Sequence, residues 1–254
     1  MTSQMEKARR FRSLHDPQNP LILYNAWDAG SALAVERAGA KAVATSSWSV
    51  AAAQGYADGE HLPLEDALSV VARITDRVKL PVTIDFEGGY ADDPETIGRN
   101  VRRLLAHGVV GFNLEDQILN GPGLYSVEDQ LLRIRAARQA VDASGVSAFL
   151  NARTDVFLKA PQGADSADLI EEALVREKAY ASAGADGFFV PGLKEKTLIR
   201  QVCDAVLLPL NVMTSGNAQE VRELANLGVA RISLGPAPYI DFVSKFEKSA
   251  RAFV

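Results

Sequence analysis

Residues 81–115 read PVTIDFEGGYADDPETIGRNVRRLLAHGVVGFNLE, and this stretch decides the fold. It begins with the apolar run PVTIDFE (81–87) and ends with a second one, VGFNLE (110–115). Between them, residues 94–108 open with a proline, repeat apolar residues at helical spacing and end at a glycine. Neither apolar run alternates cleanly with polar residues, which is typical of strands buried on both faces of a parallel sheet. The stretch therefore predicts a strand–helix–strand unit.

The same alternation continues along the whole chain. The predicted strands lie at 20–25, 41–47, 81–87, 110–115, 146–153, 186–191, 208–213 and 230–235, and the longer predicted helices at 3–14, 64–78, 94–108, 126–141 and 166–184. Eight strands alternating with helices in 254 residues indicate an α/β fold of the (β/α)₈ TIM-type barrel class, preceded by an N-terminal helix. An open doubly wound sheet uses the same alternation, but the first strand–helix turn here lacks a glycine-rich dinucleotide loop. No linker divides residues 1–254, so we expect one domain, with 1–19 as N-terminal helix and lead-in.

Composition and charge exclude several classes of protein. The chain has 27 Lys and Arg against 32 Asp and Glu, a net charge of −5, and so lacks the basic surface of a nucleic-acid-binding protein. No apolar run approaches the roughly 18 residues that a membrane span needs. Cys203 is the only cysteine, which excludes an intrachain disulfide and a cysteine-based zinc site and favours a cytoplasmic location.

Polar residues stand where the predicted strands end, which is where catalytic residues lie in such barrels. Asp85 and Glu87 are two apart on one strand and project to the same face, and Glu115 ends the next strand. Three carboxylates this close repel one another unless protons or a cation neutralise them, and hard oxygen ligands suit Mg²⁺, or alternatively Mn²⁺. Arg153 ends the fifth strand and can pair bidentately with a substrate carboxylate. The structural alternative for each carboxylate alone is a helix cap or a loop-fixing ion pair.

Four motifs, in order and spacing, resemble the isocitrate lyase/phosphoenolpyruvate mutase superfamily. They are TSSWSVAAAQGYADGE (45–60), TIDFEGGY (83–90), GFNLEDQ (111–117) and NARTDVF (151–157). The likeness extends from Tyr24 to about Pro191, and the motifs are specific only when they are taken together. The resemblance implies a Mg²⁺-dependent barrel enzyme that acts on 2-oxo acids through an enolate-like intermediate.

The resemblance also implies roles for residues of this chain. The implied metal ligands are Asp85, directly, and Asp58, Glu87 and Glu115, largely through waters. The implied substrate contacts are Ser46, Ser47 and Trp48 for the oxo-acid end and Arg153 for a carboxylate, with Tyr24 and Asn211 as further candidates. The candidate catalytic residues are Arg153, Asp58 and Tyr90.

The chain departs from the family pattern at several places, among them the end of the sixth strand, where the mutase and phosphonopyruvate hydrolase branches have a histidine and this chain has a residue close to Pro191. Its third strand carries Asp85-Phe86-Glu87 where the family usually has Asp-x-Asp. Members that cleave isocitrate or methylisocitrate carry a Lys-x-Cys-Gly-His loop after the fourth strand, and residues 117–126 here read QILNGPGLYS. The mutase and phosphonopyruvate hydrolase branches have a lysine directly after the Glu-Asp pair, where this chain has Gln117. These departures argue against isocitrate cleavage and against C–P chemistry, and they leave the general acid/base unidentified.

The sequence as a whole predicts a Mg²⁺-dependent enzyme acting on a small 2-oxo carboxylate, by C–C bond cleavage of the lyase or oxaloacetate decarboxylase type. The alternatives are a C–P bond enzyme, of the phosphonopyruvate hydrolase or phosphoenolpyruvate mutase type, and a non-catalytic 2-oxo-acid binder. The expected partners are the substrate and further copies of the chain in a dimer or tetramer, with no nucleic acid and no membrane. We expect the tail KFEKSARAF (245–253) to form an amphipathic helix that packs on the barrel.

Overall fold

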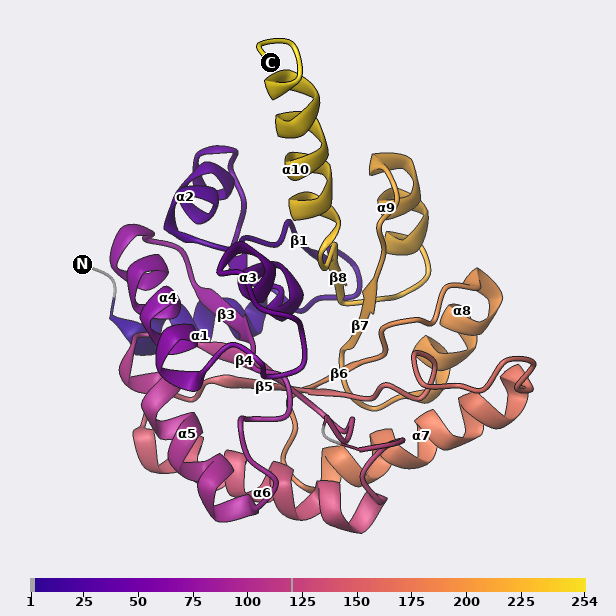
Figure 1. Cartoon of the computed structure of the whole chain (residues 1–254). Coiled ribbons are helices and arrows are strands. Elements are labelled where there is room, and N and C mark those ends of the chain that lie inside the picture. The colour runs from indigo at the N-terminus through magenta and orange to yellow at the C-terminus, as the bar shows by residue number, and fades with distance from the viewer. Residues whose placement is uncertain (1–2, 120) are drawn as a thin grey trace.

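The computed structural model describes residues 3–119 and 121–254 and has eight parallel strands with helices around them (Figure 1). The strands are β1 (Leu21–Leu23), β2 (Val43–Ala44), β3 (Val82–Asp85), β4 (Gly111–Glu115), β5 (Phe149–Arg153), β6 (Gly187–Phe189), β7 (Leu210–Met213) and β8 (Arg231–Ser233). The helices are α1 (Gln4–Ser13), α2 (Ala29–Arg37), α3 (Ser47–Ala53), α4 (Leu64–Arg77), α5 (Pro94–Ala106), α6 (Val127–Ser144), α7 (Ser166–Ser182), α8 (Lys196–Ala205), α9 (Ala218–Ala225) and α10 (Ala237–Ala250).

The strands form a nearly closed barrel. They pair in parallel in the order β1-β8-β7-β6-β5-β4-β3-β2, so that only β1 and β2 lack a continuous ladder between them. Just beyond these two strands, Ala26 and Thr45 form an isolated parallel bridge, and the Ala26 N–H donates to the Ala44 carbonyl at 2.7 Å. The Asn25 side-chain amide also donates to the Thr45 carbonyl at 2.7 Å. The prediction of a (β/α)₈ barrel is confirmed.

Each predicted strand is present but shorter than its apolar run. The third run, 81–87, contributes only Val82–Asp85 to the sheet, so Glu87 lies in the loop that follows. The second run ends early as well, because residues 47–53 form the short helix α3, with Ser46 in extended conformation at its N-cap. The sequence analysis did not predict this helix, which turns the Ser46–Trp48 segment over the mouth of the barrel.

Helix α5 shows how the outer layer is held against the strands. The Asp93 side chain caps the helix by accepting from the Thr96 N–H at 2.8 Å. Ile97, Val101 and Leu104, at helical spacing, are fully buried. Burial of each such side chain contributes about 1.5–3 kcal/mol. The helix thereby fixes the position of the loop between β3 and α5, which carries part of the candidate site.

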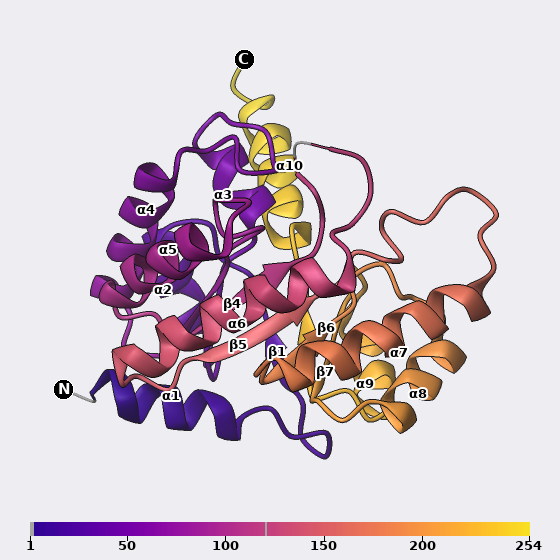
Figure 2. The same cartoon turned by 90° about the horizontal axis from the view of Figure 1, so that it is seen from below.

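Helix α1 closes the amino-terminal end of the barrel (Figure 2). Phe11 meets the ring of Phe149, the first residue of β5, edge to face at 5.8 Å between ring centroids. The ring of His15 stacks on Phe149 at 3.9 Å. The Gln4 side chain donates to the carbonyls of Leu105 and Val109 at 2.9 and 2.8 Å. With this end covered, the carboxyl ends of the strands are left as the open mouth.

Helix α10, the yellow helix of Figure 1, contacts the barrel through Tyr239 and Phe242, whose rings meet Trp27, and beyond them it projects away from the barrel. Pro238 is its only buried residue, while Phe242 and Phe246 are 51% and 66% exposed. The expectation that the tail packs on its own barrel is therefore wrong, because an apolar helical face does not specify which surface covers it. Neither α10 nor any other helix within residues 3–119 and 121–254 is long and apolar enough to cross a membrane.

Candidate active site

Polar side chains surround a cavity of about 150 Å³ at the carboxyl ends of the strands. Its polar lining consists of Asn25, Thr45, Ser46, Ser47, Asp58, Asp85, Asn113, Arg153 and Ser233. The rest of its lining is Trp48, Leu158, Phe189, Pro191, Met213, Gly235 and Pro236. The cavity therefore has an acidic side, formed after β2, β3 and β4, and a side with few polar groups, formed after β5 to β8.

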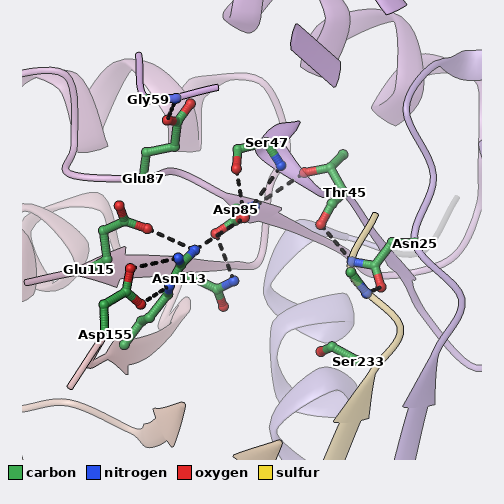
Figure 3. A network of polar contacts seen from close by, with 12 residues as sticks. Asn25, Thr45, Ser47, Gly59, Asp85, Glu87, Asn113, Glu115, Asp155 and Ser233 are labelled. Atoms are coloured by element: carbon green, nitrogen blue, oxygen red, sulfur yellow. Dashed lines mark hydrogen bonds and ion pairs between the residues drawn. The ribbon is translucent and has the colours of Figure 1, made fainter. Parts of the chain in front are cut away.

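Asp85 lies at the centre of the polar network (Figure 3). Its Oδ2 accepts from the backbone N–H and the hydroxyl of Ser47 at 3.3 and 2.9 Å. Its Oδ1 accepts from the Asn113 side-chain amide at 3.0 Å, and Arg153 Nη1 lies 3.7 Å from Oδ2. Groups from β4, β5 and α3 thus fix the orientation of this carboxylate.

Glu87 is buried beside Asp85, two residues further along the chain. Its Oε2 accepts from the backbone N–H groups of Gly59 and Glu60 at 2.9 and 2.7 Å, which ties the loop after α3 to the loop after β3. Burial, together with the charges of Asp58 and Asp85, raises the pKa of Glu87 to about 8. The pKa of Asp58 is raised as well, by burial and by the charge of Asp85. Burial and these charges therefore favour the protonated form of the Glu87 carboxyl group when no cation is bound.

Glu87 and two residues near it have left-handed backbone conformations. Glu60, Glu87 and Tyr90 have φ angles of 60°, 49° and 57°. Such conformations cost a non-glycine residue roughly 1–2 kcal/mol each, and they concentrate at functional sites. The Glu60 carboxylate accepts from the Tyr90 N–H at 2.6 Å, so the two loops hold each other in place. Burial and the neighbouring carboxylates raise the pKa of Tyr90, which keeps its hydroxyl protonated.

Arg153 is bound mainly by carboxylates of the protein. Its Nε and Nη2 donate to the two carboxylate oxygens of Asp155 at 2.6 and 2.8 Å, and its Nη1 lies 2.7 Å from Glu115 Oε2. Although burial lowers it, the charges of Glu115 and Asp155 hold the pKa of Arg153 well above its usual value. Burial raises the pKa of Glu115, against the opposing charge of Arg153. The guanidinium keeps N–H groups on its Nη1 and Nη2 edge for another acceptor.

The structure brings most of the predicted site residues together. Ser46, Ser47, Trp48, Asp58, Asp85 and Arg153 line the cavity, Glu87 and Tyr90 line a small adjoining one, and Glu115 lies behind Arg153. Two predicted substrate contacts lie elsewhere. Tyr24 is 47% exposed and lines a groove beside α2 on the outside of the barrel. Asn211 is buried in the barrel interior, where its Oδ1 accepts from the Asn151 side chain at 3.1 Å.

Three residues of the site were missed as candidates by sequence reasoning. Asn113 orients Asp85, and Asp155 orients Arg153. Asn25 accepts from the backbone N–H groups of Leu234 and Gly235 at 3.0 Å, which joins the end of β1 to the loop after β8. Asn25 and Asp155 each follow a strand end within two residues, and this position was the signal that could have identified them, whereas Asn113 lies in the middle of β4.

The donor set fits Mg²⁺ chemically, although it is not arranged as a finished ligand cage. Within the described ranges, no three His, Cys, Asp or Glu side chains converge closely enough to hold a metal ion. Mg²⁺ does not require such a cluster, because it keeps several waters and takes one or two carboxylates directly. Burial, and after it the neighbouring carboxylates, raise the pKa values of Asp58, Glu87 and Glu115, and a divalent cation beside these groups would favour their charged forms.

Comparison with known proteins identifies the family. The family model described as phosphoenolpyruvate phosphomutase matches residues 11–254. The 2-methylisocitrate lyase of Escherichia coli K12 is 33% identical over 211 residues, which are 80% of this chain and 68% of that protein. The oxaloacetate decarboxylase of Paraburkholderia xenovorans LB400 is 27% identical over 242 residues, 92% of this chain and 77% of that protein.

A crystal structure from Burkholderia cenocepacia J2315, of a protein proposed to be a phosphonomutase, is 45% identical with a TM-score of 0.95. The match covers 99% of this chain and 100% of that one. Because the family model spans nearly the whole chain, the protein belongs to the phosphoenolpyruvate phosphomutase family, within the isocitrate lyase/phosphoenolpyruvate mutase superfamily of lyases and mutases.

Proposed function

We propose that the protein is a Mg²⁺-dependent enzyme that cleaves a C–C bond of a small 2-oxo carboxylate, as a lyase or oxaloacetate-type decarboxylase. Mn²⁺ is the alternative metal. The observation that carries the proposal is the gathering of Asp58, Asp85, Glu87 and Glu115 with one arginine, Arg153, at the mouth of the barrel. This charge arrangement suits a divalent cation and an anionic substrate together.

In this proposal, one group of residues binds the metal and another binds the substrate. Asp85 would bind the metal directly, and Asp58, Glu87 and Glu115 would hold it through waters. A bound Mg²⁺ supplies polarisation of the 2-oxo group and stabilisation of the negative charge that develops there, a contribution of several kcal/mol. The amide and hydroxyl groups of Ser46–Trp48 receive the oxo-acid carboxylate, and the unused N–H groups of Arg153 bind a substrate oxygen.

The loop after β4 favours decarboxylation over reactions that need an acid to protonate the departing fragment. Its sequence contains no Cys, His, Lys or Glu, and Asn120 within it lies outside the described residues. Its one titrating side chain, Tyr125, donates its hydroxyl to Asp92 at 2.6 Å, and burial and this bond raise the pKa of Tyr125 to about 12. In decarboxylation the C3–C4 bond breaks, C4 leaves as CO₂, and the electron pair passes toward the 2-oxo group. A proton reaches C3 only afterwards, and solvent can supply it.

C–P bond chemistry is the second candidate. It is favoured by the 45% identity with the Burkholderia protein that is proposed to be a phosphonomutase. It is disfavoured by Gln117, which stands where the resemblance calls for a lysine in the C–P branches. The third candidate function is non-catalytic binding of a 2-oxo acid, because no general acid/base has been identified.

A substrate panel separates the three. Oxaloacetate, methylisocitrate, phosphonopyruvate and phosphoenolpyruvate are incubated with the protein and Mg²⁺, and with excess chelator as control. We expect CO₂ and pyruvate from oxaloacetate, with the rate reduced to background by the chelator. Turnover of phosphonopyruvate or phosphoenolpyruvate alone would assign C–P chemistry. Calorimetric binding of oxaloacetate without any turnover would assign a binder.

We also infer that the protein is a homo-oligomer joined through α10. The helix exposes Ile240, Phe242, Val243 and Phe246. An apolar groove, lined by Ile22, Tyr24 and Trp27 with residues of α2, lies on the outside of the barrel. If the α10 of a second copy lay in this groove, the apolar face of the helix and the apolar groove would both be buried. Sedimentation of the wild type against Phe246→Glu tests this: we expect an oligomer that the substitution dissociates, and a wild-type monomer would refute it.

A further inference from the structure

The side of the cavity opposite the carboxylates is mostly apolar, with the Ser233 hydroxyl as a polar group among its lining. Leu158, Phe189, Pro191, Met213 and Pro236 form its apolar part, and we call these five residues the apolar wall. They come from β6, β7 and the loops that follow β5, β6 and β8. In the strand order of the barrel, β6 to β8 lie across the mouth from β2 and β3. A substrate with its oxo-acid end at Asp85 therefore extends toward the wall.

The side chains of the apolar wall leave room in the cavity for a small substituent of the substrate. Phe189 is only 4% exposed, and the guanidinium carbon of Arg153 lies 5.9 Å from the centre of its ring. Met213 extends over Gly235, where a Cβ would meet its Sδ at 2.5 Å. Methionine is unbranched and adapts to irregular apolar shapes. The Met213 side chain can therefore adjust to substituents of different size.

The wall offers no partner for a charge. Among the described residues that line the cavity, Arg153 is the one cationic side chain, and Asp155 and Glu115 already bind it. A second permanent charge on the substrate would be removed from water at the wall without a counter-ion, which is strongly unfavourable. An uncharged substituent loses nothing there and gains apolar contact.

We propose that the apolar wall selects 2-oxo acids whose substituent on C3, next to the bond that breaks, is hydrogen or a short alkyl group and not a charged group. The inference rests on the proposed function, which places the 2-oxo end at Asp85. A carboxylate that leaves as CO₂ is compatible with the wall, because its charge is lost as the bond breaks. A carboxylate that stays on the product is excluded.

Three matched compounds test the wall: oxaloacetate, 3-ethyloxaloacetate and oxalosuccinate, which carry hydrogen, ethyl and carboxymethyl on C3. Burial of each methylene or methyl group is worth about fourfold in affinity, so kcat/KM for the ethyl compound should be about 16-fold above that for oxaloacetate. For the carboxymethyl compound it should be at least about 100-fold below the ethyl compound, because the charge is desolvated without a partner. Equal or better use of oxalosuccinate overturns the inference.

A charge placed on the wall should reverse the preference. Leu158 is 46% exposed at the rim, so Leu158→Arg should fold and should raise kcat/KM for oxalosuccinate at least tenfold while lowering that for the ethyl compound. The matched control is Leu132→Arg, at an exposed leucine of α6 that does not line the cavity, which should leave the ratio unchanged. An unchanged ratio in Leu158→Arg overturns the inference. If none of the three compounds is turned over, the proposed function fails, and calorimetric affinities of the same compounds then decide on the wall.

Discussion

Glu87 should make the metal-free protein less stable as the pH rises. Below pH 4.5 the carboxyl group is protonated in both the folded and the unfolded chain, and it makes no difference to stability. Between 4.5 and about 8 the folded protein keeps the proton that the unfolded chain has lost. The folded state then binds the extra proton, so its stability falls by about 1.4 kcal/mol for each pH unit of increase.

Summed from pH 4.5 to about 8, this slope means that Glu87 lowers the free energy of unfolding by at most about 5 kcal/mol. The substitution Glu87→Gln should remove it, because the glutamine carbonyl oxygen can accept the same N–H groups of Gly59 and Glu60 and never ionises. The variant should therefore be close to the wild type near pH 5 and more stable than it at pH 8.

Urea denaturation at pH 5, 6, 7 and 8 in excess chelator measures the effect. The matched control is Glu171→Gln, at an exposed position of α7, whose profile should run parallel to that of the wild type. Parallel profiles for Glu87→Gln and the wild type over this range would refute the assignment of a buried, protonated Glu87. A stability difference between Glu87→Gln and the wild type that narrows toward pH 8 would refute it equally, because the effect of pH would then have the opposite sign.

Three further predictions concern the site. Asp85→Ala should abolish Mg²⁺ binding in calorimetry with oxalate present, since the other carboxylates act through water; unchanged affinity would remove Asp85 as the direct ligand. Arg153→Lys should weaken oxaloacetate binding about tenfold or more, because lysine cannot form the two-donor fork that binds Asp155 and also offer further N–H groups to the substrate. Equal affinity would mean that Arg153 only fixes the surrounding carboxylates. Methylisocitrate should show no cleavage at neutral pH, because the loop 117–126 contains no thiol, imidazole or amine to serve as acid; efficient release of pyruvate and succinate would falsify this placement.

The barrel was predictable because it depends on a pattern repeated along the chain. Apolar runs and helix signals such as Pro94 and Gly108 recur, and each strand of the barrel falls within a predicted run. Helix α3 was not predictable in this way, because TSSWSV has no helical periodicity and its backbone bends only where pairing with β3 stops. The direction of α10 was not predictable either, since the partner surface of an apolar face is set by tertiary contacts.

The positions of the site residues were predictable from the sequence, but the pairs that their side chains form were not. The strand-end rule places Asp85, Glu115 and Arg153 at one mouth, and the structure has them there. That Arg153 is held by Asp155 depends on side-chain directions at the end of β5, which composition does not reveal. Tyr24 illustrates the opposite failure: it also stands at a strand end, but alternation along β1 turns it outward.

The two sides of the cavity come from different parts of the chain, and this separation has a chemical consequence. Residues at the ends of β3 and β4 and in the segment after β2 carry the acidic side, and residues at the ends of β6 and β7 and in the loops after β5, β6 and β8 carry the apolar wall. Arg153, at the end of β5, lies between them and contacts both Glu115 and the ring of Phe189. A substitution in the wall, such as Leu158→Arg, can therefore alter which substituent is accepted without disturbing the hydrogen bonds that orient Asp85. Under the proposed function, the acidic side would determine that a 2-oxo acid reacts, and the wall would determine which one.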